Sequence, residues 1–584
     1  MDTLLTYFHR TASRAIERAF KGDLSADELS ADMAPCAQEQ FGHYQCNSAL
    51  RLAKQLKANP RSVAQKIIDC LDEETRHLCS QIDIAGPGFI NFTLSAKTLS
   101  EQLQKMLHEP FLGVPRPKEK KKIIVEFSSP NIAKELHVGH LRSTIIGDCL
   151  ARLFEFLGQD VLRLNHIGDW GTQFGMLITY MKQHTPAVLK GKEPTDLQHL
   201  LIWYRASKKQ FDEDPQFKKT AQLEVVKLQS GDPEAMHAWK LICDISRKGF
   251  QEIYDLLGVK LVERGESFYN PFLKDVVDEL DRKGLVQFSD GAKCIFLDGF
   301  KNREGEPLPL MIQKSDGGYN YDTTDMAAIR YRVQVDHAER IIIVTDVGQS
   351  LHFQMIFAAA EKAGWYDPAK VQLDHVGFGL VLGADGKKFK TRSGDTEKLI
   401  DLLLEAIEQA KILIAERMPD GDPKEINHLA HVIGIGAVKY SDLASHRTKD
   451  YTFSYERMLR FEGNTAVFLL YAYVRINGIK RKTGADIAHI LSSEKLHLQH
   501  PSEISLGLHL RRFSEILDSV SRDLLPNRLA EYLYELAEKF NAFFRDCRVD
   551  GAPEEKSRLI LCELSARTLK QGLHILGLET VDRM

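Results

Sequence analysis

The sequence predicts a multidomain α/β protein: a doubly wound parallel sheet with an insertion, preceded by a small α/β domain and followed by a helical one. Three observations indicate this arrangement. The chain has 584 residues. This is too long for a single hydrophobic core, so roughly two to four domains are expected. Strand-like apolar runs alternate with helical segments up to about residue 449, and helices dominate beyond Tyr451. Proline and lysine gather at residues 115–122, the most linker-like stretch of the chain, and a boundary is expected there.

The first domain is predicted over residues 1–114. Helical patterns cover Leu4–Phe20 and Cys46–Leu56. A Gly-Pro-Gly turn at residues 86–88 precedes the strand-like run Phe89–Phe92. These mixed signals predict a small α/β unit.

The central domain is predicted over residues 115–450, with a polar helical insertion at about residues 181–257. Its strands are expected at four apolar runs: Ile123–Phe127, Asp160–Asn165, Ile341–Thr345 and Val371–Phe378. Apolar strands that alternate with helices are typical of a parallel sheet covered on both faces. The fold class of this domain is therefore Rossmann-type.

The last domain is predicted over residues 451–584 and is expected to be all-helical. Its clearest helix is Arg528–Phe544. The apolar stripe of that helix is formed by Leu529, Leu533, Leu536, Phe540 and Phe544.

Composition excludes several classes of protein. With 43% hydrophobic and 27% charged residues, the chain is ordinary for a globular protein. Its nine cysteines form no C-x-x-C pair, which argues against a zinc ribbon or a disulfide framework and favours the cytoplasm. No signal peptide or membrane span is recognisable. The net charge of −4 requires any nucleic-acid surface to be a local basic patch.

The most informative stretch is Ser128–Thr144, which follows the strand at Ile123–Phe127 and leads into a helix expected to end at Gly158. It places His137 and His140 around Gly139 at a strand-to-helix turn. Free N–H groups and the helix dipole favour anions there, histidine adds donors, and glycine leaves room for a flat ring. The turn therefore predicts a site that binds a nucleotide and stabilises its phosphates.

A second basic loop spans Gly386–Asp395 and precedes an apolar helix expected from Thr396 to Ile414. It carries Lys387, Lys388 and Lys390. Clustered cations of this kind suit a polyphosphate leaving group, because they neutralise the charge that develops as a bond to the α-phosphate breaks.

Together, the turn and the loop resemble the HIGH and KMSKS signatures of class I aminoacyl-tRNA synthetases. Longer stretches are similar to those of the arginyl-tRNA synthetases: Glu126–Thr144, Asn165–Gly175, Tyr321–Asp325, Asp346–Phe353 and His375–Gly379. The resemblance continues to the tail at Leu576–Met584. One departure is Thr391, at the place of the second KMSKS lysine, for which a lysine just upstream compensates in many relatives. Here that lysine would be Lys387, and which lysine of the loop dominates stays open.

The resemblance implies three sets of site residues. Catalysis is assigned to His137, His140, Lys387, Lys388 and Lys390. ATP binding is assigned to Ser128, His137, Gly139, His140 and Val381. Arginine binding is assigned to Glu126, Asn131, Tyr321, Asp325 and Gln349. Within the last set Asp325 faces the guanidinium, a planar donor fork that carboxylates recognise best. The competing interpretations are a helix N-cap for Asp325 and a packed aromatic ring for Tyr321.

The activity implied is that of an arginine–tRNA ligase, in which L-arginine, ATP and tRNA(Arg) give arginyl-tRNA, AMP and diphosphate. Mg²⁺ is expected with ATP as a substrate complex, and no tightly bound metal is expected. The resemblance also implies a cytoplasmic monomer, arginine activation that awaits tRNA, a C-terminal anticodon-binding domain and an N-terminal contact to the tRNA corner. Local support for RNA binding is modest: the basic residues are Lys480, Arg481, Lys482, Arg511 and Arg512, and the tyrosines are Tyr471, Tyr473, Tyr532 and Tyr534. The competing interpretation is that these tyrosines belong to the core.

Two other classes stay open from the sequence. A small-molecule nucleotidyltransferase also uses such a turn and loop, but it needs neither a helical tail nor the insertion. An RNA-binding relative without activity is the alternative outside the enzymes, and the retained histidines and lysines argue against it.

Overall fold

The computed structural model describes residues 3–302, 304–383, 385–387 and 398–584. The chain divides into two compact units. Residues 118–459 form the sheet unit, and residues 1–117 with 460–584 form the terminal unit.

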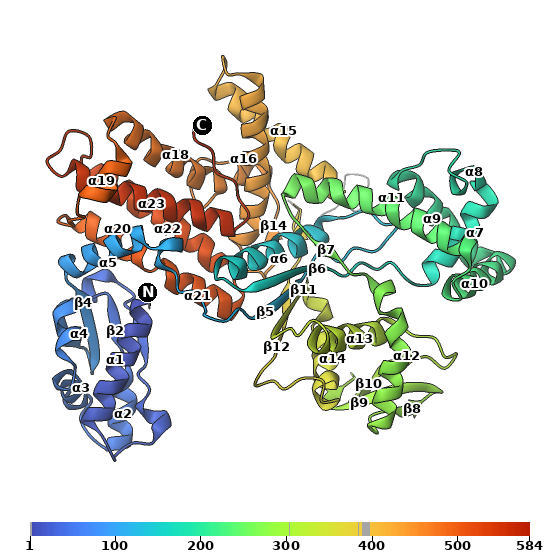
Figure 1. Cartoon of the computed structure of the whole chain (residues 1–584), viewed down its shortest axis with the longest axis horizontal. Helices are drawn as coiled ribbons and strands as arrows, with labels where there is room; N and C mark the ends of the chain where they lie inside the picture. Colours follow the sequence, from blue (N-terminus) through green and yellow to red (C-terminus); the bar gives the residue numbers. More distant parts are fainter. Residues whose placement is uncertain (1–2, 303, 384, 388–397) are drawn as a thin grey trace. The chain divides into compact units, whose positions relative to one another are not determined.

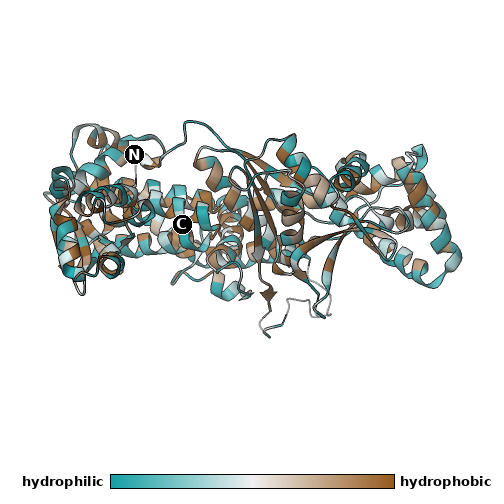
Figure 2. Cartoon of the chain, turned by 90° about the horizontal axis from the view of Figure 1, so that it is seen from below, coloured by the Kyte–Doolittle hydropathy of each residue, from teal (hydrophilic) through white to brown (hydrophobic). Residues whose placement is uncertain are grey.

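The centre of the sheet unit is a five-stranded sheet of order β12-β11-β5-β6-β7. Its strands are β5 (Lys122–Glu126), β6 (Asp160–Asn165), β7 (Val262–Glu263), β11 (Arg340–Asp346) and β12 (Gln372–Phe378). All neighbouring strands are parallel, which confirms the predicted parallel sheet. Ile123, Ile124 and Val125 are buried, and Figure 2 shows the strands of this sheet as mainly apolar. A central strand covered on both faces needs such a run.

Helices connect and cover these strands (Figure 1). They include α6 (Val138–Phe156), α7 (Thr172–His184), α13 (Tyr321–Gln334), the short η4 (Val347–Gln349), α14 (Ser350–Lys362), α15 (Leu399–Arg417), α16 (Pro423–Leu443) and α17 (Tyr455–Met458). The helix predicted from Thr396 to Ile414 corresponds to α15, and its first two expected residues lie outside the described ranges. Two short parallel strands, β13 (Val381–Leu382) and β14 (Tyr451–Thr452), pair beside this group.

Two additions interrupt the parallel sheet. Helices α8 (Pro186–Leu189), α9 (Leu197–Glu213), α10 (Pro215–Gln229) and α11 (Pro233–Leu257) gather with α7 at one end of the sheet unit (Figure 1). Helix α12 (Glu266–Arg282) then leads to an antiparallel sheet of β8 (Gln287–Ser289), β9 (Ala292–Lys301) and β10 (Pro307–Gln313). The sequence did not predict this second sheet.

The N-terminal part of the terminal unit has an antiparallel sheet of order β1-β2-β4-β3. Its strands are β1 (Met33–Pro35), β2 (Tyr44–Cys46), β3 (Cys79–Ala85) and β4 (Phe89–Leu94). Its helices are α1 (Leu4–Ala19), η1 (Ala26–Leu29), η2 (Glu39–Phe41), α2 (Ser48–Leu56), α3 (Pro60–Asp69), α4 (Glu73–Leu78), α5 (Ala96–His108) and η3 (Pro110–Gly113). The helix expected from Cys46 begins at Ser48 instead, because Cys46 still pairs with Ile90 in the sheet.

The C-terminal part of the terminal unit is helical, as predicted. Its helices are α18 (Ala466–Thr483), α19 (Ile487–Ser493), α20 (Pro501–Arg511), α21 (Phe513–Asp523), α22 (Asn527–Asp546) and α23 (Glu555–Ile575). In α22 the predicted stripe is buried except for Phe544, which is 42% exposed, and the buried ring is Phe543. The expectation for Phe544 was wrong by one position, because the buried face of α22 advances in alternating steps of four and three residues and the step after Phe540 is three.

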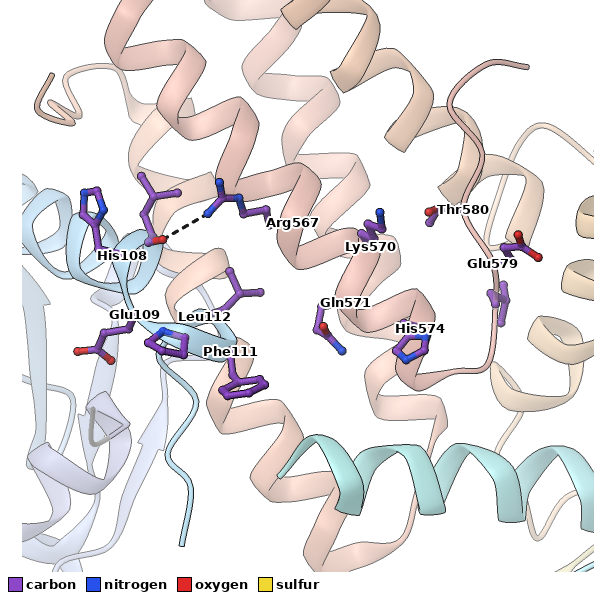
Figure 3. A pocket seen from close by; sticks show the side chains of 13 residues that line it. His108, Glu109, Phe111, Leu112, Arg567, Lys570, Gln571, His574, Glu579 and Thr580 are labelled. Atoms are coloured by element: carbon purple, nitrogen blue, oxygen red, sulfur yellow. Dashed lines mark hydrogen bonds between the residues drawn. The ribbon is translucent and has the colours of Figure 1, made fainter. Parts of the chain in front are cut away.

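Buried polar contacts join the two parts of the terminal unit. The Tyr44 hydroxyl donates to Glu515 Oε1 at 2.8 Å, and the backbone N–H of Leu5 donates to the same atom at 3.0 Å. Helix α5 packs against α20. Beside this contact a cavity of about 800 Å³ lies between η3 and α23, where Arg567 donates to the Leu107 carbonyl at 3.4 Å (Figure 3). Residues more than 450 positions apart therefore belong to one packed body.

Candidate active site

The predicted site residues of the sheet unit follow the carboxyl ends of neighbouring strands. Glu126 ends β5, Ser128 and the histidine turn come next, Gln349 follows β11, and Val381 follows β12. Strand β5 lies between β6 and β11, which is where the strand order reverses. Ligands of open parallel sheets bind outside the carboxyl ends at such a point. The topology thus brings residues more than 200 positions apart to one edge.

The histidine turn caps its own helix. His137 is the N-cap of α6: its backbone N–H donates to His140 Nδ1 at 3.1 Å, and the Gly139 N–H donates to His137 Nδ1 at 3.0 Å. The two ring centroids are 4.1 Å apart. Because each Nδ1 accepts a hydrogen bond, the proton of each neutral ring lies on Nε2.

His140 is held in its neutral form. Burial lowers its pKa to about 3, and the neighbouring His137 adds to the shift. At neutral pH the ring therefore offers an uncharged Nε2–H donor beside the positive end of the α6 dipole. This arrangement suits a phosphate oxygen without a change of protonation.

Gly139 is required by the close approach of a ring. A Cβ at this position would lie 2.8 Å from His137 Cε1 and 3.0 Å from His137 Nδ1. The flat ring found against Gly139 is therefore the imidazole of His137 itself.

The loop between β5 and the histidines has an unusual backbone. Ser128, Ser129 and Ala133 have φ of 71°, 47° and 58°, a left-handed conformation that persists only where surrounding contacts impose it. The Ser128 N–H donates to Ser143 Oγ at 2.9 Å, and that hydroxyl donates to the Val344 carbonyl at 2.7 Å. These bonds attach the loop to α6 and β11.

The Ser128 side chain faces a residue that the sequence did not predict. Its hydroxyl lies 2.8 Å from the hydroxyl of Tyr254, on α11, which also lies 3.2 Å from Asn165 Nδ2. Burial raises the pKa of Tyr254 to about 12. The helical insertion thus supports the loop that follows β5, and no local pattern around Tyr254 indicates this.

Helix α13 places the two predicted guanidinium residues. Asn320 is its N-cap, with the Thr323 N–H donating to Asn320 Oδ1 at 3.3 Å, so Asp325 lies inside the helix. The N-cap interpretation of Asp325 was therefore wrong. Tyr321 is 61% exposed, so the packed-ring interpretation was also wrong.

Asp325 belongs to a cluster that includes residues not predicted from the sequence. Its Oδ2 lies 2.6 Å from His352 Nε2, and His352 Nδ1 lies 3.2 Å from Asp322 Oδ1. Burial raises the pKa of Glu266 to about 8, and the charges of Asp325 and then Asp169 add to the shift. His352 and Asp322 lie inside stretches matched above, whereas Glu266 carries no sequence signal.

Glu126 is already paired. Its Oε2 lies 2.5 Å from Arg332 Nη1, and both side chains are buried. Burial opposes the charged form of Arg332, but Glu126 outweighs it and raises the pKa of the guanidinium above its ordinary value. The other two predicted arginine ligands, Asn131 and Gln349, are exposed at the same edge. Asn131 forms a single parallel bridge to Gly168, where an added Cβ would lie 2.1 Å from Asn131 Oδ1.

The flanks of the lysine loop are attached to the histidine turn. Val381 is buried in β13, and Lys387 is exposed. Beyond the loop, Lys398 pairs with Glu135 at 2.7 Å, and the Leu399 N–H donates to the Leu136 carbonyl at 3.0 Å. The predicted Lys388 and Lys390 lie outside the described residues.

The four tyrosines predicted as stacking faces for RNA divide into two buried rings, one exposed ring, and Tyr534, which is half-buried with its ring centroid 5.5 Å from that of Phe468. Tyr473 and Tyr532 are 7% and 3% exposed, so they belong to the core and that interpretation was wrong for them. Tyr471 is 38% exposed, with the guanidinium of Arg475 4.8 Å from its ring centroid. Among the basic residues, Arg511 is buried, and Lys480 is paired with Glu563.

In the described part of the chain, no helix has the length and hydropathy to cross a membrane. No group of three or more His, Cys, Asp or Glu side chains in the described ranges is arranged to hold a metal ion.

Comparisons with known proteins agree along the whole chain. Three family models match in order: "Arginyl tRNA synthetase N terminal domain" at residues 7–94, "tRNA synthetases class I (R), catalytic domain" at residues 102–455, and "DALR anticodon binding domain" at residues 469–584. The arginine–tRNA ligases of Protochlamydia amoebophila and Chlamydia caviae are 60% and 51% identical, with full coverage of both chains.

Solved structures agree with these matches. The arginyl-tRNA synthetase of Plasmodium falciparum superposes with a TM-score of 0.87 at 36% identity, covering 100% of each chain. The Thermus thermophilus arginyl-tRNA synthetase shares the fold, with a TM-score of 0.81 at 24% identity over 100% of each chain. The chain therefore belongs to the arginyl-tRNA synthetases, a family of the class I tRNA synthetases.

Proposed function

We propose that the protein is an arginine–tRNA ligase that activates L-arginine with ATP and transfers it to the 3′ end of tRNA(Arg). The observation that carries the proposal is that one unit of the chain contains two clusters of side chains with different chemistry. A histidine pair caps α6, and a cluster of carboxylates on α13 with His352 of α14 lies in the same sheet unit. The first suits phosphates, and the second suits a guanidinium.

In the first step a carboxylate oxygen of arginine attacks the α-phosphorus of ATP. A new P–O bond forms, the bond to the bridging oxygen of the β-phosphate breaks, and diphosphate leaves. His137 and His140 would donate from Nε2 to the phosphate oxygens as negative charge redistributes in the transition state. Lys387, with Lys388 and Lys390, would neutralise the departing diphosphate. Positioning and electrostatics suffice, because no covalent enzyme intermediate is needed.

The same geometry supports arginine as the amino acid. Asp325 would accept from the guanidinium, and Glu266 is placed to add a second carboxylate near it. Tyr321, exposed beside the His352 ring at 5.2 Å, would line the pocket. Lysine offers a point-like ammonium in place of a donor fork, so it would leave buried acceptors unpaired.

Glu126, Asn131 and Gln349 would hold the backbone end of the amino acid. One oxygen of Glu126 is committed to Arg332, which leaves Oε1 for the substrate ammonium. Ser128 and Val381 would contribute backbone groups to the nucleotide, since the Ser128 hydroxyl faces Tyr254.

Mg²⁺ would arrive with ATP, since phosphate oxygens are the hard ligands it prefers. In the second step the 3′-terminal adenosine attacks the adenylate carbonyl, and AMP leaves. The helical part of the terminal unit, which matches the anticodon-binding family model, would read the anticodon, with Tyr471 and Arg475 as one stacking surface. We place the protein in the cytoplasm as a monomer.

Charging of tRNA with labelled arginine tests this proposal. Purified protein, ATP and a bulk tRNA preparation should convert labelled arginine to an acid-precipitable form, and labelled lysine should stay soluble. Turnover of an acid substrate without tRNA would indicate a small-molecule nucleotidyltransferase. Tight tRNA binding without release of diphosphate would indicate an inactive RNA-binding relative.

A further inference from the structure

His352 lies between two carboxylates that come from one helix. The ring extends from α14 toward α13, with Nε2 2.6 Å from Asp325 Oδ2 and Nδ1 3.2 Å from Asp322 Oδ1. The exposed fraction of each of the three side chains is below one quarter. Asn320 Nδ2 donates to the remaining oxygen of Asp322 at 3.1 Å, so Asp322 is held on both sides.

The geometry sets the protonation of this ring. An ionised carboxylate only accepts hydrogen bonds, and a neutral imidazole has only one N–H. With an acceptor at each nitrogen, both nitrogens must carry protons for both contacts to be favourable. Burial opposes the charged ring, but the bonds to Asp322 and Asp325 and their charges outweigh it and raise the pKa of His352 to about 9.

The other titratable groups around the ring do not replace this cation. Tyr321 lies on its edge, and Asp322 raises the pKa of that hydroxyl. His375, from β12, is neutral because burial lowers its pKa to about 4. Glu266, from α12, faces Asp325 and keeps its proton below about pH 8. His352 is therefore the positive partner of the carboxylate pair.

We propose that His352, as an imidazolium shared by Asp322 and Asp325, is a positioning and specificity-determining residue of the arginine site. The inference rests on the proposed function, and it assigns a role to a residue outside the predicted ligand set. His352 does not itself touch the reacting atoms. It acts through Asp325.

Two physical consequences follow from the shared ring. The bond to Oδ2 fixes the rotation of the Asp325 carboxylate and leaves Oδ1 for the incoming guanidinium. The imidazolium also cancels one of the two negative charges, so the pair keeps one net charge, which matches one guanidinium. A carboxylate without this partner would rotate, and the alignment of Oδ1 with the guanidinium would be lost.

The kinetic test uses the full-length protein with tRNA present. His352→Gln keeps a polar side chain of similar reach but carries no charge, and its donors lie on one nitrogen instead of two. We expect the KM for arginine to rise about 10- to 100-fold, the range for loss of a charged hydrogen bond. The KM for ATP should stay within about twofold. Gln354→Ala, exposed on the same helix, is the matched control and should leave both constants unchanged.

A double-mutant cycle separates positioning from general damage. Asp322→Asn removes the charge at Nδ1 alone and should raise the arginine KM by a smaller factor. Because Asp322 acts through the same ring, Asp322→Asn combined with His352→Gln should be no worse than His352→Gln alone.

Nuclear magnetic resonance of ¹⁵N-histidine-labelled protein provides a readout that does not depend on turnover. The His352 signals, assigned by their absence in His352→Gln, should show both nitrogens protonated at pH 7.5. They should titrate only near pH 9. A neutral tautomer at pH 7.5 would overturn the proposal.

The kinetic outcomes are equally separable. An unchanged arginine KM in His352→Gln, or an equal rise in both KM values, would overturn this inference and leave the ligase activity standing. If the wild-type protein showed no arginine-dependent ATP–diphosphate exchange, by contrast, the proposed function itself would be contradicted.

Discussion

The two ends of the proposed site solve opposite electrostatic problems. At the phosphate end, His137 and His140 cap a helix, and burial keeps the His140 ring neutral. At the guanidinium end, the carboxylates of Asp322 and Asp325 are compensated by a charged His352, while Glu266 retains a proton. The comparison indicates that His140 should add no pH dependence to ATP binding near neutrality, whereas arginine binding should be coupled to protons.

The largest effect is expected at the phosphate end. His140→Ala removes an Nε2–H donor at the point where transition-state charge develops, so kcat for ATP–diphosphate exchange should fall about 10²- to 10³-fold. Thermal unfolding of the variant, measured in parallel, should show a loss of no more than about 2 kcal/mol from the missing cap contact. Near-wild-type exchange from a folded variant would remove the turn from the catalytic site.

At the guanidinium end the expected effect is also large, but it appears in the KM for arginine instead of in kcat. Asp325→Asn leaves the guanidinium facing an amide, so the KM for arginine should rise about 100-fold, the cost of removing one partner from a charged pair. The KM for ATP should change little. If steady-state assays show the ATP constant rising in parallel, Asp325 supports the fold of the whole site instead of the guanidinium pocket.

The release of a proton on substrate binding should also distinguish the two ends. In the empty pocket the pKa of Glu266 is about 8, so near pH 7 the folded protein holds a proton that an ordinary carboxyl would have lost. A guanidinium favours the ionised form, and arginine binding should therefore release close to one proton. Titration calorimetry with tRNA present, in buffers of different ionisation enthalpy, should show this release.

The release should be absent in Glu266→Gln. Glu266 also makes stability depend on pH. Its carboxyl ionises above about pH 4.5 in the unfolded chain but only near pH 8 in the folded chain, so the free energy of unfolding should fall as the pH rises between these values. ATP binding should release no proton from His140, whose pKa lies near 3. Buffer-independent arginine binding would contradict the assignment of Glu266 to the pocket.

The smallest effect concerns the attachment of the lysine loop. Glu135 and Lys398 are 24% and 36% exposed, and a pair of this kind contributes at most about 1 kcal/mol. Glu135→Gln should therefore change kcat or the KM for ATP by less than about fivefold and leave the KM for arginine unchanged. The charge-swapped variant Glu135→Lys with Lys398→Glu should restore part of the loss. Stopped-flow measurement of adenylate formation resolves changes of this size.

The two ends also differ in how far the sequence could predict them. The histidine turn is local: His137, Gly139 and His140 lie within four residues, and their strand and helix are read from the same stretch. The carboxylate end draws on α12, α13 and α14, so Glu266 meets Asp325 only after the chain has folded. The same limit explains why Tyr254 was missed beside Ser128.

A second limit of prediction from the sequence concerns which face of a helix is buried. The helical pattern identified α22 but placed Phe544 in the core, where Phe543 lies, and offered Tyr532 to RNA although its hydroxyl donates to the His509 carbonyl at 3.0 Å. Which face of a helix is covered depends on its neighbours, and the sequence of the helix alone does not specify them. The antiparallel sheet β8–β10 went unpredicted because its strands lie in a region that otherwise alternates between helix and strand.

The most direct test of the account is ATP–diphosphate exchange by the wild-type protein with arginine, with and without tRNA, and with lysine in place of arginine. The account predicts exchange when arginine and tRNA are both present and none with lysine. Exchange with arginine alone would keep the two-ended site and discard the requirement for tRNA. No exchange under any condition, from protein shown to be folded, would contradict the claim that the histidine turn and the carboxylate cluster form one site of arginine activation.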